Sequence, residues 1–95
     1  MPSDLIQESR LSKNPQVVGQ TVDSEVVLVL LEKNQIKVLN EVGTRIWELV
    51  DGERTIAEIS RILCDEFNVD EQESLEDAIE FLEELLIKGI VSLHS

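Results

Sequence analysis

The spacing of hydrophobic residues changes at Asn40, and this change limits the chain to folds in which strands come before helices. Before it, residues 26–31 form a continuous run of Val and Leu with the length of a buried strand. After it, apolar residues recur three or four positions apart, as on one face of a helix. Strands gathered first and helices second are typical of an α+β fold.

Two further segments of strand character flank the central run. Residues 16–23 carry three valines among polar residues, and residues 36–39 begin with alternating apolar and polar side chains. The connections are short: residues 23–24 are typical of a turn, and residues 32–35 include Asn34, which tolerates a left-handed conformation. Because strands joined by such turns run antiparallel, we expect a three-stranded antiparallel β-meander.

Three helices are expected after the meander. Each begins at a residue that favours helix N-caps, and a glycine follows the expected ends of the first and the third. The N-caps are Asn40, Thr55, and Asp70 or one of its neighbours, and the glycines are Gly52 and Gly89. Residues 90–93 add a short extended tail. A three-helix unit beside a small sheet is winged-helix-like in outline.

The third helix carries its hydrophobic residues asymmetrically. The centre of the expected buried stripe is formed by Leu75, Ile79, Leu82 and Leu86. Ala78 and Leu85 lie on one shoulder, about 60–80° away on the helical wheel. Phe81 lies further round on the same side, together with Asp77. Phe81 either covers the rim of the core or lines a groove, and the helix pattern leaves both readings open.

The chain has 95 residues, the length of a single domain, and 42% of them are hydrophobic, which suffices for one core. Residues 1–15 are polar and mixed in composition, so we expect them to form a flexible N-terminal arm. We expect residues 16–93 to form the folded domain.

The charge balance excludes several classes of partner. Twenty acids against 8 bases give a formal net charge of −12, which repels nucleic acids and anionic membranes. A basic or neutral partner is the natural complement, although acidity can also serve solubility alone. The start of the chain lacks the features of a signal peptide, and the longest apolar run is too short to span a bilayer. We therefore expect a cytoplasmic protein.

Residues that support catalysis are scarce. Cys64 lies within a helical apolar pattern, and His94 stands next to the last residue, so the two do not suggest a nucleophile and its base. The glycines are isolated, which argues against a phosphate-binding loop. Residues 70–73 lack the pattern of a calcium-binding loop. The sequence predicts a non-catalytic binding domain with no metal site and no cofactor.

The edge of the meander is the candidate site. In a three-stranded meander the first and third strands each leave unpaired N–H and C=O groups along one side. An extended peptide can add to such an edge as a further strand. The same edge can also pair with a second copy of the chain, so we expect a monomer or a weak dimer.

Three blocks carry a more specific resemblance: LNEVGTRIWELVDG at residues 39–52, RTIAEI at 54–59 and FLEELLIKGIV at 81–91. They are similar to the PqqD family, and the similarity extends over residues 16–91. The resemblance implies a small winged-helix-like recognition element, a peptide chaperone that captures the leader segment of a ribosomally synthesised precursor peptide. It would deliver this precursor to a modifying enzyme such as a radical-SAM protein, a leader peptidase or a cyclase.

In that family the leader adds as a strand beside the third β-strand and lies against the third helix. Carried over by position, the implied peptide-binding residues are Gln35, Ile36, Lys37, Val38, Leu39, Asp77, Ala78, Phe81, Glu84 and Leu85. Gly43 and Trp47 are assigned to packing. The resemblance leaves the pathway open among pyrroloquinoline quinone synthesis, lasso peptides and radical-SAM-modified peptides.

Three other classes of protein fit parts of the sequence. A winged-helix transcription regulator fits the expected element order, but its recognition helix would carry Arg61 as its one base. An acyl carrier protein is similarly small and acidic, and Ser74 lies in a faint carrier-like motif. A plain dimerising module would use the free strand edge for self-association.

Overall fold

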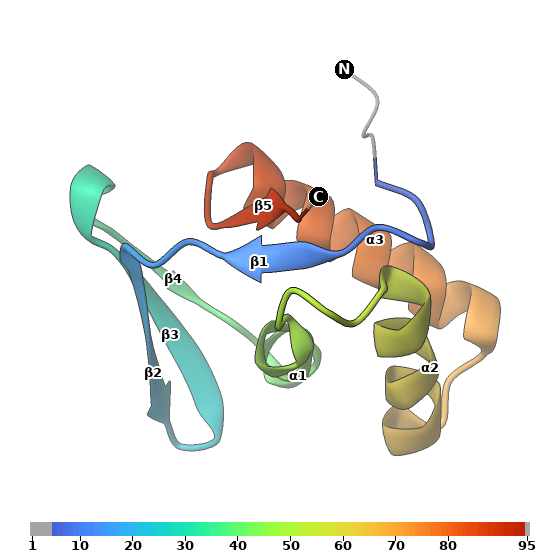
Figure 1. Ribbon diagram of the computed structural model, residues 1–95. Coiled ribbons are helices and arrows are strands. Elements are labelled where there is room, and N and C mark those ends of the chain that lie inside the picture. Colours follow the sequence, from blue (N-terminus) through green and yellow to red (C-terminus); the bar gives the residue numbers. More distant parts are fainter. Residues whose placement is uncertain (1–4, 95) are drawn as a thin grey trace.

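The computed structural model describes residues 5–94, and its sheets and helices follow one another as Figure 1 shows. The strands are β1 (Leu11–Lys13), β2 (Val17–Val22), β3 (Glu25–Leu30), β4 (Gln35–Val38) and β5 (Val91–Leu93). The helices are α1 (Glu41–Leu49), α2 (Ile56–Phe67) and α3 (Glu71–Ile87), and a single 3-10 turn, η1 (Leu31–Lys33), precedes β4.

Strands β2, β3 and β4 form the antiparallel meander that the sequence predicted. The hairpin between β2 and β3 turns at Asp23 and Ser24, which both have positive φ, and Asn34 takes the expected left-handed conformation before β4. Side chains alternate along β3, where Val26, Leu28 and Leu30 are buried. The α+β prediction, with a three-stranded meander followed by three helices, is confirmed.

All three predicted N-caps are formed. The Asn40 side chain accepts a hydrogen bond from Gly43 N at 2.8 Å. Thr55 and Glu58 form a reciprocal capping box, and the Asp70 carboxylate accepts from Gln72 N at 3.1 Å. Each cap satisfies backbone donors that the first turn of a helix leaves free. The caps explain why the helices begin where the sequence predicted.

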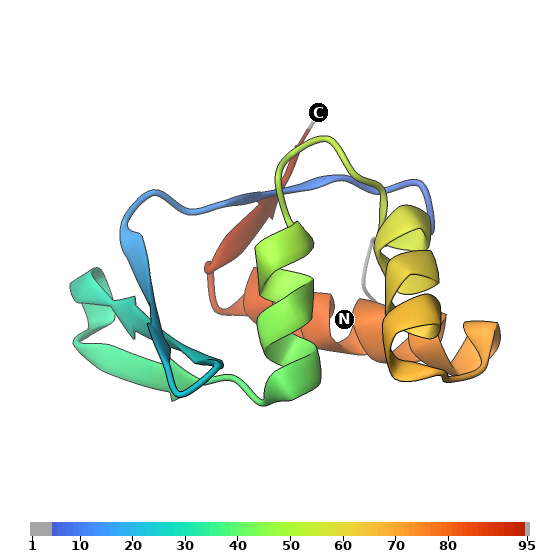
Figure 2. The ribbon, with the colours of Figure 1, turned by 90° about the horizontal axis from the view of Figure 1, so that it is seen from below.

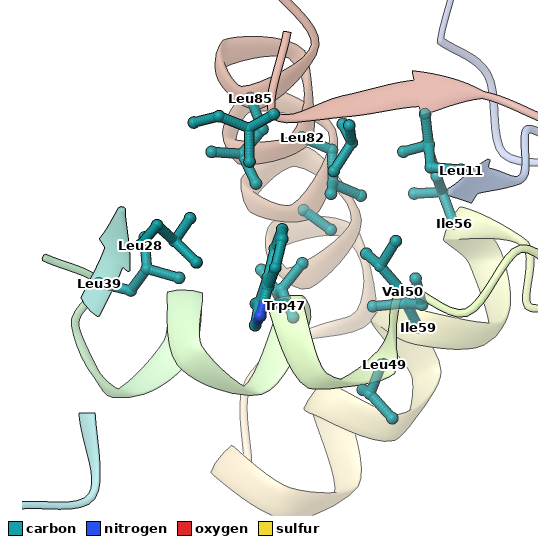
Figure 3. Packing of buried hydrophobic residues seen from close by; sticks show 14 of the residues in the cluster. Leu11, Leu28, Leu39, Trp47, Leu49, Val50, Ile56, Ile59, Leu82 and Leu85 are labelled. Atoms are coloured by element: carbon teal, nitrogen blue, oxygen red, sulfur yellow. The ribbon is translucent and has the colours of Figure 1, made fainter. Parts of the chain in front are cut away.

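The helices all lie on one side of the meander (Figures 1 and 2). The core fills the space between them, with Trp47 at its centre and Leu28 and Leu39 on the side of the sheet (Figure 3). Gly19 of β2 lies against this ring, since a Cβ atom there would come within 3.0 Å of Trp47 Nε1. The other face of the meander is left without a helix.

Residues 5–15 differ from the flexible arm that their polar composition suggested. Leu5 and Leu11 are buried in the core, and β1 pairs with β5 in a second, two-stranded antiparallel sheet. The hydrogen bond from Asn14 N to Ile90 O, at 3.0 Å, continues this attachment to the turn between α3 and β5. The described part of the arm therefore packs against the domain, while residues 1–4 lie outside the described residues.

The buried stripe of α3 is rotated from the one that the helical wheel suggested. Its fully buried residues are Ala78, Leu82 and Leu85, accompanied by Ser74, whereas Leu75, Ile79 and Leu86 are only partly buried. The small Ser74 and Ala78 allow neighbouring elements to approach closely. The Ser74 hydroxyl donates to Ser60 O of α2 at 2.8 Å. A buried, hydrogen-bonded serine cannot carry a prosthetic arm, which removes the acyl-carrier alternative.

Candidate functional site

The free edge of β4 is the first part of the candidate site. β4 pairs with β3 on one side only among the described strands. The pairing of β4 with β3 continues one residue beyond β4, where Leu39 N donates to Val26 O at 2.9 Å. In an antiparallel ladder, residues that bond to the partner strand alternate with residues whose N–H and C=O point away. The backbone groups of Ile36 and Val38 therefore point to the free edge.

Thr44 of α1 closes the ladder at the end of β4. Val26 N donates to Thr44 Oγ1 at 2.9 Å, and the same hydroxyl donates to Leu39 O at 3.4 Å. The hydroxyl thus stands between a strand donor and a strand acceptor that would otherwise meet directly. This arrangement fixes the start of α1 against the end of the meander.

The side chains of β4 divide between the two faces of the sheet. Lys37 is opposite the buried Leu28, so it lies on the face that the helices cover. Ile36 and Val38 lie on the opposite face, where both are largely exposed. A peptide bound between β4 and α3 would therefore contact the side chain of Lys37. At the free edge of β4 it would contact the backbone groups of Ile36 and Val38.

An ion pair connects β4 to α3. Lys37 Nζ lies 2.9 Å from Glu84 Oε1, and Lys88 Nζ lies 3.3 Å from the same oxygen. Hydrogen bonds from Lys37 first and Lys88 second lower the pKa of the Glu84 carboxyl. Lys33 also reaches α3, because its Nζ donates to Lys88 O at 2.9 Å. These contacts hold the C-terminal half of α3 beside the β4 edge.

Two hollows lie on either side of the ion pair. The edge hollow, of about 550 Å³, is lined by Leu30, Gln35, Ile36, Lys37, Val38, Lys88 and Ile90. The acidic hollow, of about 330 Å³, is lined by Asn40, Val42, Gly43, Ile46, Asp77, Glu80, Phe81 and Glu84. Because Lys37 lines one and Glu84 the other, their ion pair stands at the boundary between them.

Phe81 forms a wall of the acidic hollow by packing on the first turn of α1. A Cβ atom at Gly43 would come within 3.0 Å of Phe81 Cε1, so a larger residue would push the ring. Phe81 is half-buried and belongs to the rim of the core. The helical wheel left open whether Phe81 covers the rim of the core or lines a groove. In the structure Phe81 covers the rim of the core and also lines the acidic hollow.

The sequence-predicted site residues fall into two groups. Gln35, Ile36, Lys37, Val38, Asp77, Phe81 and Glu84 line the two hollows. Leu39, Ala78 and Leu85 are buried in the core. They lie behind the surface of the site, so their side chains can shape it without being reached by a peptide.

Sequence reasoning missed five residues that line the acidic hollow: Asn40, Val42, Gly43, Ile46 and Glu80. Four of them come from α1 and its N-cap, for which the sequence indicated only capping and packing on the core. The signal that could have found them is Val42, an apolar residue in the first turn that stays more than a third exposed.

Metal sites and membrane-spanning helices are both absent from residues 5–94. No group of three or more His, Cys, Asp or Glu side chains there is arranged to hold a metal ion. No helix in this part of the chain has the length and apolar character needed to cross a membrane.

Known proteins with solved structures share this fold. One is described as TbiB1 in complex with the TbiA(beta) leader peptide, and its sequence is 32% identical to this one. The two chains superpose with a TM-score of 0.78, over 84% of this chain and 93% of that chain. A structure described as lasso peptide synthetase B1 complexed with the leader peptide is 20% identical, with a TM-score of 0.76, over 88% of this chain and 96% of that one. No curated protein matches the chain.

The family profile agrees with the resemblance found in the sequence blocks. The profile of PqqD, described as coenzyme PQQ synthesis protein D, matches residues 25–91. This range contains β3, β4, all three helices and the first residue of β5. The chain belongs to the PqqD family.

Proposed function

We propose that this protein captures the leader segment of a ribosomally synthesised precursor peptide as an additional strand along β4. The observation that carries the proposal is the position of the free β4 edge beside α3, with a hollow at each side of the Lys37–Glu84 ion pair. Backbone groups of Ile36 and Val38 supply hydrogen bonds to the leader. Strand addition of this kind gives affinity through the main chain and specificity through alternate side chains.

Side chains of the leader that face α3 enter the hollows. Lys37, Asp77, Phe81 and Glu84 contact them, while Leu39, Ala78 and Leu85 support these residues from the core. The relatives described with leader peptides support this choice of ligand. The small size of the surface favours micromolar or tighter binding, on the order of what short peptide interfaces reach.

The protein itself is a non-catalytic carrier in this proposal. It presents the leader-bound precursor to a modifying enzyme, which can be a radical-SAM protein, a leader peptidase or a cyclase. Because precursors of this kind are made on ribosomes, the encounter takes place in the cytoplasm. The winged-helix regulator gains no support from these comparisons.

Titration of isotope-labelled protein with the leader peptide encoded beside its gene tests the proposal. We expect amide shifts at residues 35–39 and around Phe81, with new protection of the Ile36 and Val38 amides from hydrogen exchange. Shifts confined to Cys64 and the C-terminal residues, with β4 and α3 unmoved, would sink the proposal.

A further inference from the structure

The face of the meander that points away from the helices is unusually apolar. Val18 and Val22 of β2, Val27 and Val29 of β3, and Ile36 and Val38 of β4 all lie on it, as the strand register requires. We call these six residues the outer face, and the polar residues of the meander strands on the same side are Gln20, opposite Val27, and Glu25. Soluble proteins normally place polar side chains on the solvated face of an antiparallel sheet. Six apolar side chains there need an explanation.

The outer face is open to solvent in the described part of the chain. Val18 is 46% exposed, Val22 52%, Ile36 68% and Val38 63%. Both ribbon views show the helices, β1 and β5 on the other side of the meander (Figures 1 and 2). A contiguous apolar patch of this kind marks an interaction surface more often than scattered exposed residues do.

Charge decides which occupant fits. A second copy of this chain would bring a net charge of −12 toward an equal charge, which opposes face-to-face pairing. Asp23 and Glu25 border the patch at the hairpin between β2 and β3, and Glu25 shares its face. The complementary occupant is a protein surface with an apolar centre and lysine or arginine side chains around it.

The outer face also adjoins the proposed leader site. Ile36 and Val38 belong to both, because their side chains lie on the outer face while their backbone groups point to the free edge. A leader strand added to β4 would extend the outer face by its own outward side chains. A partner seated there would touch the protein and the leader together.

We infer that the outer face docks the peptide-modifying enzyme through an apolar patch ringed by basic residues on that enzyme. This inference rests on the proposed function for the identity of the partner. Docking beside the leader keeps the rest of the precursor close to the enzyme and raises its effective concentration there.

The test uses the full chain and the modifying enzyme encoded beside its gene. The double variant Val18→Thr/Val22→Thr keeps the β-branched shape and the strand preference, but it places two hydroxyls on β2, the strand of the outer face that β3 separates from β4. We expect its affinity for the enzyme to fall about tenfold or more, as for central contacts of an interface. Its affinity for the leader peptide should stay that of the wild type.

The matched control is Ile87→Gln, which removes an apolar side chain of α3 that is 76% exposed and lies outside the outer face. Ile87→Gln should bind the enzyme as tightly as the wild type does. Higher salt should weaken the binding of the enzyme by both of these proteins. Cross-saturation from the enzyme to the valine methyl groups of the wild type provides a second measurement that does not depend on the folding of a variant.

Several outcomes overturn the inference. The first is that the double variant binds the enzyme as tightly as the wild type does. The second is that Ile87→Gln loses as much affinity for the enzyme as the double variant. The third is that the wild type does not bind the enzyme. Self-association of the wild type that the double variant abolishes would assign the outer face to a second copy. If the enzyme binds through the outer face but the leader peptide does not bind, the docking surface stands and the proposed function fails.

Discussion

The two edges of the meander differ in what lies beside them. By the alternation of the ladder, β2 points the backbone groups of Gly19 and Thr21 outward, as β4 does those of Ile36 and Val38. Along β4, an ion pair to α3 and two hollows adjoin the edge. Along β2, five of the six residues are exposed, and Gly19 lies on the Trp47 ring. An open edge becomes a candidate site when a second element supplies walls for side chains.

Proline substitution gives the largest expected difference between the two edges. Ile36→Pro removes a donor that points to the free edge of β4, without removing a bond to β3. We expect leader affinity to fall about tenfold or more, because one backbone hydrogen bond is lost and a peptide carbonyl is left unpaired. Isothermal titration with the leader peptide measures the effect.

The control for this prediction is Thr21→Pro, which removes an outward donor from the β2 edge. It should bind the leader as the wild type does. Equal losses in both variants would show that the proline acts on the whole sheet. Fluorescence of Trp47, the one tryptophan of the chain, reports whether both variants remain folded.

Removing the Phe81 ring takes away part of the wall beside the β4 edge, so that this edge becomes more open, like the β2 edge. Phe81→Ala takes away a wall of the acidic hollow, and we expect leader binding to weaken by about 1–2 kcal/mol, the scale for losing part of an aromatic contact. Phe67→Ala is the matched control, because Phe67 is also a half-buried helical phenylalanine but lines a different hollow. If Phe67→Ala weakens binding as much, the loss reflects stability and α3 has no particular role at this edge.

The meander, the starts of the helices and the choice of the β4 edge could be predicted from the sequence. They depend on local sequence rules or on specific sequence blocks. The continuous apolar run at residues 26–31 and the turn residues defined the meander, and N-cap chemistry at Asn40, Thr55 and Asp70 defined the helix starts. The resemblance to a family then pointed to β4 and α3. These features depend on neighbours within a few positions or on specific blocks.

The parts that could not be predicted depend on contacts between distant residues. β1 has three residues, too few for a clear pattern, and it exists because its partner β5 lies about eighty positions later. The rotation of α3 follows from the close approach at Ser60 and Ser74, which hydrophobicity alone does not detect. The contribution of α1 to the acidic hollow depends on where Thr44 fixes that helix.

Gly43→Ala tests whether α1 shapes the β4 site through Phe81. The new Cβ atom meets Phe81 Cε1 at 3.0 Å, so the ring must move. Alanine favours a helix by about 1 kcal/mol over glycine, which offsets part of the strain. We expect ring-proton shifts of Phe81 and leader binding that is about two- to threefold weaker, a change of well under 1 kcal/mol. Unchanged ring shifts would contradict the contact.

The smallest effect is expected from the ion pair that ties β4 to α3. The pKa of Glu84 is lowered in the folded protein by hydrogen bonds from Lys37 and Lys88. A lowered folded pKa means that the pair stabilises the fold above the ordinary pKa of a glutamate and ceases to do so as the pH falls through the lowered value. Because both side chains are partly exposed, solvent limits the contribution to about 1 kcal/mol or less.

Lys37→Met removes the larger cause and should raise the pKa of Glu84 toward its ordinary value, as measured by NMR titration of the Glu84 carboxyl. Lys33→Met is the control, because Lys33 reaches Lys88 O and makes no ion pair with Glu84. An unchanged pKa of Glu84 in Lys37→Met, or an equal rise in both variants, would contradict the assignment. If the rise is confirmed and leader affinity is unaffected, the ion pair holds β4 and α3 together without contacting the peptide. The hollows and the backbone edge would then account for the difference between the two edges.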